Sequence, residues 1–374
     1  MNTTENQPAE NSILDKDSLA QNSLPRKESF FRHHGHKIAI GAILLIFVGI
    51  PLLLAALEYQ QKIKLEPTVF YLLEQVAKYS LMTAGIFWFF FFGGALGSFL
   101  NVIAWRLPQG RTLWGSSYCP GCDTKLKLQD NFPLFGWLWR KGRCRTCQME
   151  IAGRYFIVEL IASVTIGILA LVELIGAGAN LQSTPDQITF SFERFAAAPE
   201  PRFIGYFLLH SSLIFILITA ALITLQKQAL PKSILVFGFC IYIITSVAWT
   251  QALPFTENHL EITDTNASFA SIRAMCCGLI VSLVGGLMLT RLLPGKRLKG
   301  KWDFTLLLML VGAVLGWQAA VVTIALTTLF TLVGRLIYSK CTPTEVLWLA
   351  TSITIYTLRI WIEQWQNGPL DGGS

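Results

Sequence analysis

The sequence has few charged residues for its length. Only 14% of its 374 residues are Asp, Glu, Lys or Arg, whereas 53% are hydrophobic. A soluble domain of this size needs more charge to cover its surface, so the composition argues against a soluble protein. It indicates instead a protein that crosses a membrane several times, in agreement with a mean hydropathy of +0.50.

The sequence also lacks the glycine-rich signatures of soluble nucleotide-binding domains. It contains no GxGxxG and no P-loop, and no repeat is detectable at a period of about 20–50 residues. Gly93, Gly94 and Gly97 lie in an apolar run, where we expect them to allow close helix contacts. The net charge of +7 comes from basic residues in loops beside apolar runs. That placement is typical of membrane orientation and disfavours a nucleic-acid partner.

No cleavable signal peptide is evident, because the first apolar run begins late and is too long for one. Residues 1–36 are polar, rich in Asn, Ser, Glu and Lys, and show no periodicity. They predict a disordered cytoplasmic tail. His33, His34 and His36 border basic residues at the end of this tail, and we interpret them as part of a basic flank rather than as a metal site.

The apolar runs predict the fold. A run of about 20 residues is long enough to cross a bilayer. Beyond six clear runs, a pair lies within 304–338 and divides near Gly316, and a last run covers 344–363. The first half of the pair is short, so we expect it to be tilted or partly re-entrant. The prediction is an all-α polytopic membrane protein with nine transmembrane helices, eight and ten being the alternatives. The six clear runs are residues 38–57, 80–104, 155–178, 203–224, 233–253 and 272–293.

Lys and Arg are concentrated in alternate loops, which predicts the orientation. Loops 105–154, 225–232 and 294–303 are basic, whereas 179–202 and 254–271 are acidic or nearly neutral. Basic loops stay on the cytoplasmic side of a membrane. The pattern therefore predicts that the N-terminus and the 105–154 loop are cytoplasmic.

The 105–154 loop carries two cysteine pairs with metal-binding spacing. The pairs are Cys119 with Cys122 and Cys144 with Cys147, and 21 residues separate them. This separation is close to the zinc-ribbon spacing of about 15–20 residues. Two such pairs supply four thiolates and complete a tetrahedral site, which leaves no open position for catalysis. We therefore predict a structural zinc ion.

Local residues suit such a site, although other readings stay open. Gly121 and Gly142 are expected to give the turns their backbone freedom. Lys125, Arg143 and Arg145 are expected to offset part of the thiolate charge. The alternatives are a pair of disulfides, which a reducing cytoplasm disfavours, and a thioredoxin-like redox pair, which accounts for one CxxC but not for two.

Ordered motifs flank the cysteine pairs. They are Gly97-Ser98-Phe99-Leu100-Asn101-Val102, Arg106-Leu107-Pro108, Asp130-Asn131-Phe132-Pro133-Leu134, Trp137-Leu138, Lys141-Gly142-Arg143-Cys144, Arg154-Tyr155 and Val158-Glu159-Leu160. Together they resemble the N-terminal domain of the prepilin peptidases, the membrane aspartic proteases of type IV pilus and type II secretion systems.

This resemblance implies a function at the bacterial inner membrane. Members of the family cleave the leader from prepilin or pseudopilin precursors at the cytoplasmic face. They then methylate the new N-terminal amine with S-adenosylmethionine. The resemblance implies a substrate or methyl-transfer region that includes Gly97, Asn101, Arg154 and Glu159. For Asn101 and Glu159, a structural role at the membrane interface is the alternative. The implied partners are these precursors and the lipid bilayer.

The resemblance also implies two catalytic aspartates at the cytoplasmic ends of two later spans. One carboxylate activates water as a base while its protonated neighbour acts as an acid. The family pattern for the first is Asp-x6-Pro-Asp. When Pro231 anchors this pattern, Thr224 occupies the first aspartate position and Lys232 replaces the last one. Thr224 cannot ionise, so it cannot act as the base.

The second aspartate is also out of register. Gly312-Ala313 and the Leu-Gly-Trp-Gln of 315–318 match the span that follows this aspartate in the family. Counting back without a gap places Phe304 at the aspartate position and Asp303 one residue earlier. One residue of slip on a helix is a rotation of about 100°. Asp303 is the remaining catalytic candidate, and its alternative reading is an interfacial carboxylate paired with Lys301 or Arg297.

These readings divide the chain into four parts and leave two functions open. Residues 37–79 are expected to form an extra helix and an external loop, 80–178 the N-terminal domain of the family, and 179–374 a degenerate peptidase-like membrane domain, after the tail at 1–36. The chain is either a divergent prepilin-processing enzyme or a non-catalytic relative that binds prepilins or an assembly partner.

Overall fold

The computed structural model describes most of the chain after residue 40. The described residues are 40–41, 44–62, 69–127, 129–176, 178, 180, 195, 200–248, 264–293, 302–338 and 341–357. The predicted tail at 1–36 and most of the loops at 179–202 and 254–271 lie outside these ranges.

The described residues form helices, as the apolar runs predict. Across these ranges no strand occurs beyond two isolated bridges in the four-cysteine loop. The helices are α3 (Ile50–Lys62) after a short π-helical segment η1 (Leu45–Gly49), α4 (Val69–Arg106), η2 (Leu107–Gln109), α5 (Phe135–Trp139), α6 (Arg154–Leu169) continued by the π-helical η3 (Ala170–Ile175), α8 (Pro201–Leu225), α9 (Lys232–Ala248), α10 (Asp264–Leu292), α11 (Asp303–Ile337) and α12 (Pro343–Tyr356).

Five of the described helical stretches are long and apolar enough to cross a membrane. Two shorter apolar helices, Leu45–Gln60 and Lys232–Thr245, coincide with further predicted runs, and α12 occupies the described part of 344–363. The five longer stretches are Phe70–Gln109, Arg154–Ile175, Phe203–Leu225, Met275–Leu292 and Asp303–Ile337.

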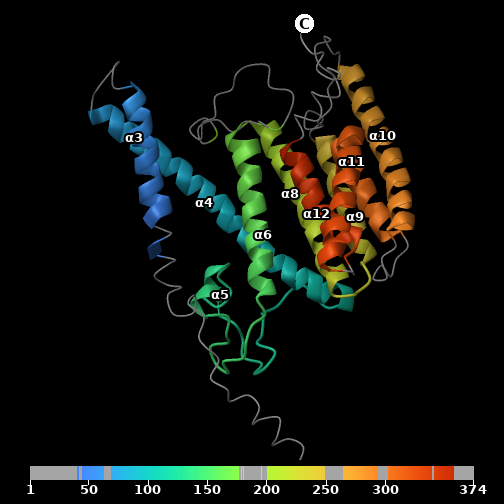
Figure 1. Cartoon of the computed structure of the whole chain (residues 1–374), viewed down its shortest axis with the longest axis horizontal. Helices are drawn as coiled ribbons and strands as arrows, with labels where there is room; N and C mark the ends of the chain where they lie inside the picture. Colours follow the sequence, from blue (N-terminus) through green and yellow to red (C-terminus); the bar gives the residue numbers. More distant parts are fainter. Residues whose placement is uncertain are drawn as a thin grey trace, which may run out of the picture.

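Helix α4 begins at Val69, although its apolar run begins only at residue 80. Part of the segment expected to be an external loop is therefore helical. The hydroxyl group of Tyr79 donates to the Glu58 carboxylate on α3 at 2.7 Å, and the Lys78 ammonium lies 3.8 Å from the same carboxylate. These polar pairs stabilise helical turns that hydropathy alone does not reveal. Figure 1 shows α3 and the first part of α4 standing apart from the other helices.

The predicted division of 304–338 is confirmed at Gly316. Its backbone is non-helical, with φ 81° and ψ 179°, a conformation that glycine adopts without the cost of a Cβ atom. The two halves of α11 run in opposite directions along α10, because the order of their contacts with α10 reverses. In chain order these contacts are Thr305 at Gly286, Gly312 at Gly278 and Ile324 at Gly285.

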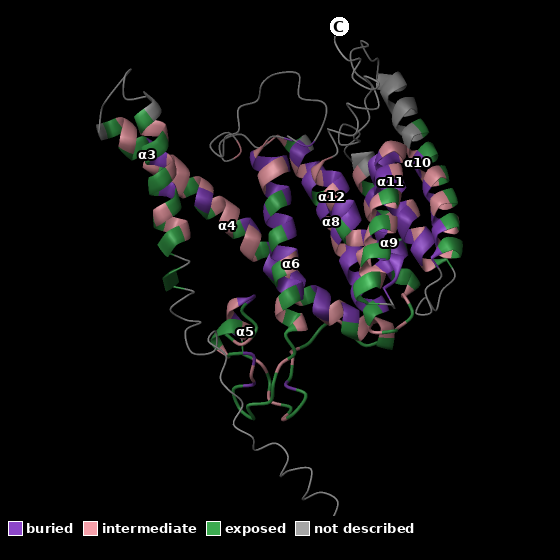
Figure 2. Cartoon of the chain, in the orientation of Figure 1, coloured by how far each residue is buried: buried purple, intermediate pink, exposed green. Residues whose placement is uncertain are grey.

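The buried core lies among α6, α8, α11 and α12. Figure 2 shows buried residues concentrated in these helices, whereas α3 and α10 are more exposed on the outside. Helices α4 and α6 also meet closely, as the glycines of the α4 run predict. A Cβ atom on Gly93 or Gly97 would lie within 3 Å of α6 backbone atoms.

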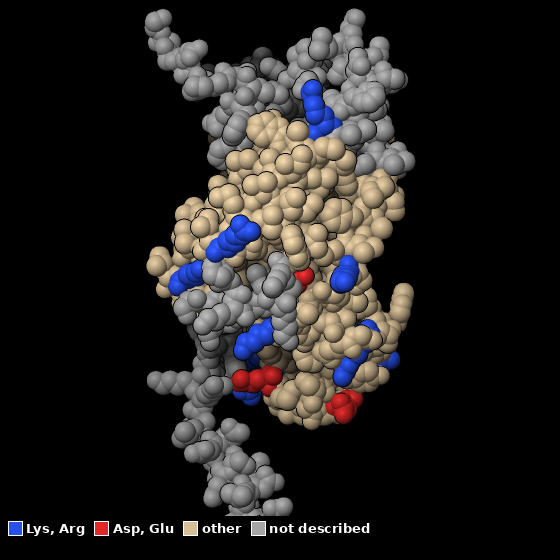
Figure 3. All heavy atoms as spheres, turned by 90° about the vertical axis from the view of Figure 1, so that its right-hand side faces the viewer, with Lys and Arg blue, Asp and Glu red and all other residues tan. Residues whose placement is uncertain are grey.

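The charged side chains visible in Figure 3 lie mainly at and below the middle of this face. Above them is a band of described residues without Lys, Arg, Asp or Glu, and one group of basic side chains lies above this band. The four-cysteine loop, the α8–α9 turn and the start of α11 lie at the lower end of the bundle (Figure 1). The described parts of the loops predicted to share one membrane face therefore lie at one end of the fold.

Substitution of Gly97 by alanine should destabilise the contact between α4 and α6. The new Cβ atom would lie 2.9 Å from the Cα atom of Glu159, so the helices must separate. Overpacking of this kind costs about 1–3 kcal/mol. We expect a lower thermal melting midpoint in detergent. Gly41→Ala is the matched control, since nothing lies within 4 Å of its Cβ position. Equal midpoints for the two variants would contradict the close contact.

Candidate functional site

Two similar turns bring the four cysteines together. In the first turn the Cys119 N–H donates to the Thr124 carbonyl at 3.0 Å, and in the second the Cys144 N–H donates to the Met149 carbonyl at 2.9 Å. The first cysteine of each pair also accepts, through its carbonyl, a backbone N–H from four residues ahead. Each pair therefore lies in a tight hydrogen-bonded knuckle, which directs both of its thiols to one side.

The positions with left-handed backbone differ in part from the expectation. Gly142 has φ +66°, as expected of a turn glycine. In the knuckles, however, Asp123 and Gln148, which follow the second cysteine of each pair, have φ 48° and 58°. Gly121 is needed for space instead, because its Cβ atom would lie 2.6 Å from the Met149 sulfur.

The four sulfur atoms have the spacing of a tetrahedral metal site. All of them lie within 4.8 Å of one another. The Sγ atoms of Cys119 and Cys147 are 3.7 Å apart, and those of Cys122 and Cys144 are 3.9 Å apart. Zinc–sulfur bonds of about 2.3 Å in a tetrahedron place the sulfurs roughly 3.8 Å apart. A disulfide requires about 2.05 Å, so the geometry fits a metal ion better than paired disulfides.

Neighbouring hydrogen-bond donors favour the thiolate form of Cys122 and Cys144. The N–H groups of Cys147 and Thr146 lower the pKa of the Cys144 thiol to about 6. The Thr124 hydroxyl and N–H lower the pKa of the Cys122 thiol. The Met149 N–H lowers the pKa of Cys147, but desolvation and the three neighbouring sulfurs outweigh it and raise this pKa to about 12. Four sulfurs this close cannot all ionise alone, and a divalent cation removes that conflict.

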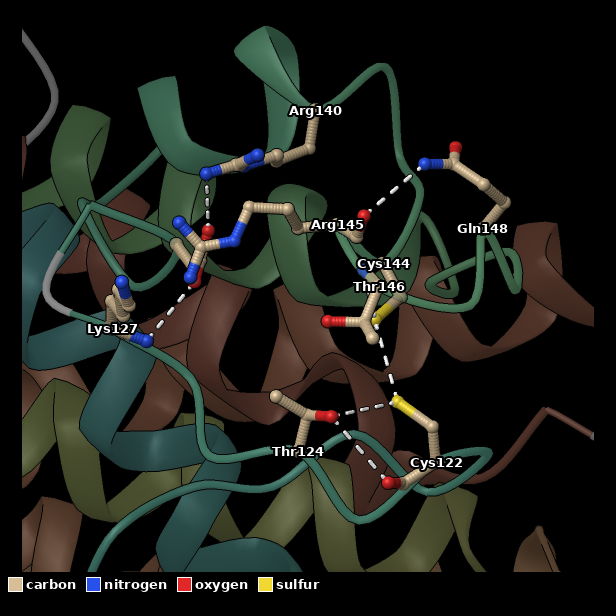
Figure 4. A network of polar contacts seen from close by, with 9 residues as sticks. Cys122, Thr124, Lys127, Arg140, Cys144, Arg145, Thr146 and Gln148 are labelled. Carbon is tan, nitrogen blue, oxygen red and sulfur yellow. Dashed lines mark hydrogen bonds and ion pairs between the residues drawn. The ribbon is translucent and has the colours of Figure 1, made fainter.

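The arginines near the cysteines are held by carboxylates (Figure 4). The Asp130 carboxylate lies 2.6 Å from the Arg140 guanidinium and 3.5 Å from that of Arg145. Arg143 lies 3.7 Å from the Glu150 carboxylate. The charge that Arg143 and Arg145 were expected to lend the thiolates is thus largely compensated. These ion pairs brace the loop instead.

One buried hydrogen bond fixes the loop to the membrane helices. The Leu134 N–H donates to the Glu159 carboxylate of α6 at 2.7 Å, and Glu159 is buried. Gly97 packs against the Cα atom of Glu159, and the Asn101 amide donates to the Gly97 carbonyl at 3.3 Å. Three of the four residues implied for the processing region therefore lie together. Arg154 lies at the first position of α6, with its guanidinium 5.5 Å from the Tyr155 ring centre.

The candidate positions of the catalytic acids are not arranged as a pair. Thr224 is buried at the end of α8, and its hydroxyl group donates to the Ala220 carbonyl at 2.9 Å. Phe304 is completely buried. The Asp303 carboxylate accepts a hydrogen bond from the Leu230 N–H, and among the described residues no second carboxylate interacts with it. Lys301 and Arg297, its alternative partners, lie outside the described residues.

A polar cluster inside the spans was missing from the sequence prediction. The Nδ1 atom of His210 on α8 lies 2.5 Å from the Oε1 atom of Glu173 in η3, and both side chains are fully buried. The Asn180 amide donates to the same oxygen at 2.9 Å and to the Ile355 carbonyl of α12 at 3.1 Å. The sequence did carry a signal for this cluster, because Glu173 and His210 each lie inside a long apolar run, where ionisable residues are rare.

Comparisons with known proteins agree with the motifs. The family model described as the Bacterial Peptidase A24 N-terminal domain matches residues 91–172. A prepilin leader peptidase/N-methyltransferase of Klebsiella pneumoniae is 32% identical over 246 residues, which cover 64% of this chain and 89% of that protein. One of Aeromonas salmonicida is 28% identical over 270 residues, covering 64% and 76%.

Other comparisons are shorter or negative. The "Type 4 prepilin-like proteins leader peptide-processing enzyme" of Escherichia coli O78:H11 is 37% identical over 99 residues, and the match covers 21% of this chain and 37% of that protein. No solved structure matches the chain significantly.

The purified protein should contain about one zinc ion per chain, held by four thiolates. Cys144→Ser should remove the metal, because three thiolates and a hydroxyl bind zinc poorly. Elemental analysis under reducing conditions measures this. Cys276→Ser is the control and should retain the metal, since Cys276 is an exposed residue of α10 far along the chain. Metal-free wild-type protein would contradict the zinc prediction.

Replacement of His210 by leucine should destabilise the bundle strongly. It leaves the buried Glu173 carboxyl group without its closest hydrogen-bond partner, a change that typically costs about 1–3 kcal/mol. The melting midpoint in detergent measures the effect. Glu74→Gln, at an exposed position of α4, is the control and should change little. A His210→Leu midpoint equal to that of this control would rule out a stabilising role for the His210–Glu173 hydrogen bond.

Proposed function

The chain belongs to the prepilin peptidase family, and we propose that it binds prepilin or pseudopilin precursors at the cytoplasmic membrane face without cleaving their leaders through an aspartate pair. The observation that carries this proposal is the state of the two acid positions. Thr224 is buried and hydrogen-bonded to its own helix, while Phe304 fills the core and Asp303 is bound to the Leu230 N–H.

Cleavage by the family mechanism needs two carboxyl groups that share a site. Their proximity splits their pKa values, so that one acts as a base and the other as an acid. A threonine hydroxyl cannot take the place of the base. Asp303, one residue before the expected position, is left without an acidic partner among the described residues. The chemistry of leader cleavage therefore lacks its central element.

The part of the chain that faces the cytoplasm supports retained recognition. The match to the family model covers residues 91–172, which contain the four-cysteine loop and the Gly97–Glu159 contact. In our proposal residues 80–178 hold the precursor near the membrane surface, the zinc ion keeps the loop folded, and 179–374 serve as a degenerate membrane scaffold. The proposed location is the bacterial inner membrane.

Methyl transfer is the activity that such a chain can retain. The relatives are named as N-methyltransferases as well as peptidases. The region around Gly97, Asn101, Arg154 and Glu159 supports this second role, because three of these residues are assembled by direct contacts. The methyl donor in this proposal is S-adenosylmethionine.

The test is to coexpress the chain with a prepilin in cells that lack other prepilin peptidases. We expect the leader to stay on the precursor, because no acid pair is present to activate water. Mass spectrometry of the precursor measures both leader loss and methyl mass. A pre-cleaved pilin offered to the same cells tests methylation separately.

The Asp303→Asn variant is the matched control. Its precursor should be indistinguishable from that of the wild-type chain. Leader loss that disappears in Asp303→Asn would overturn the proposal and assign Asp303 as a catalytic acid. Methylation of only the pre-cleaved pilin would support the methyl-transfer role.

A further inference from the structure

The segment 130–139 presents an aromatic surface that the proposed function does not explain. Phe132, Leu138 and Trp139 are 41%, 37% and 59% exposed on this segment. The other side of α5 faces inward, since the Trp137 ring lies 5.2 Å from that of Phe156 and its N–H donates to the Ile151 carbonyl at 3.2 Å. Helix α5 therefore packs one face against the loop, whereas Leu138 and Trp139 stay exposed.

This aromatic surface is continuous with a membrane helix. The Phe132 ring lies 4.9 Å from that of Phe91 on α4 and 6.3 Å from that of Trp139. Near Phe91 on α4, the exposed rings of Trp88 and Phe92, one helical turn apart, stack on each other at 5.4 Å. These α4 residues belong to a candidate membrane span, so their exposed rings face lipid. The surface on α5 extends that lipid-facing surface into the loop.

The position of the segment along α6, close to the start of the membrane span, indicates that it lies at the boundary of the bilayer. Leu134 binds Glu159, which lies five residues inside the α6 span that begins at Arg154. At 1.5 Å per residue this is about 7.5 Å along the helix. Aromatic side chains that lie about 5–10 Å below the headgroups are typical of interfacial segments. The exposed Lys141 follows Trp139 closely and suits the headgroup layer.

We propose that the Phe132–Trp139 surface inserts into the phospholipid interface on the side of the four-cysteine loop. This surface contacts the boundary between phospholipid headgroups and acyl chains, a region where aromatic side chains next to basic residues are common. The four-cysteine loop is thus fixed at two points. Leu134 binds the Glu159 carboxylate of α6, and α5 contacts the lipid. This arrangement keeps the loop from swinging away from the cytoplasmic ends of α4 and α6.

The test uses the full chain reconstituted in vesicles of phosphatidylcholine and phosphatidylglycerol in equal parts. Some vesicles carry lipids brominated near the headgroup end of the acyl chain, because bromine quenches nearby tryptophan. The chain has 11 tryptophans, so the emission of Trp139 is taken as the difference between wild type and Trp139→Phe. We expect loss of this emission with shallow bromine and little effect of an aqueous quencher.

A tryptophan placed at Tyr118 in the Trp139→Phe background is the control. Tyr118 is 56% exposed and pairs with Lys125 across the first knuckle. Its emission should respond to the aqueous quencher and not to bromine. Trp139 emission quenched mainly from water would overturn the proposal. Emission shielded from both quenchers would also overturn it and indicate that another protein segment covers α5.

Discussion

The hydrogen bond from the Leu134 N–H to the Glu159 carboxylate joins the four-cysteine loop to the membrane helix α6. A carboxylate this far inside an apolar helix is costly unless it is hydrogen-bonded, and a loop N–H this deep needs an acceptor. The Leu134 N–H supplies the donor for the Glu159 carboxylate, and the carboxylate supplies the acceptor for this N–H. At the same level Gly97 lets α4 pack closely on α6, since a Cβ atom built on Gly97 would lie 2.9 Å from the Cα atom of Glu159. The position of the four-cysteine loop therefore depends on helix packing inside the membrane.

The cost of burying polar groups also distinguishes the four-cysteine loop from the later helices α8 and α11. In the loop, every sulfur required for a metal site is present and correctly spaced. In the later helices, the residues that we propose occupy the positions of the acids stabilise a membrane bundle. Thr224 satisfies its hydroxyl within α8, and Phe304 fills the core. In the proposed account the acid pair is absent, so the chain does not need to keep two carboxylates close together in a membrane, which is energetically expensive.

Sequence patterns with strict spacing predicted the structure best. The two CxxC pairs predicted the sulfur cluster, and the short apolar run before Gly316 predicted the reversal in α11. The start of α4 was missed because Glu58 stabilises turns that look polar in the sequence. The Glu173–His210 pair was missed because partners 37 residues apart meet only through helix packing. Likewise, the ion pairs of Arg143 and Arg145 depend on the folded loop and not on proximity in the chain.

The central claim is that this chain binds a precursor and leaves its leader in place. The most direct measurement is to purify the chain from membranes that contain a full-length prepilin and to determine the mass of the pilin that copurifies. The account predicts a bound precursor with its leader intact. A bound or released pilin that has lost its leader, in membranes without another prepilin peptidase, would contradict it.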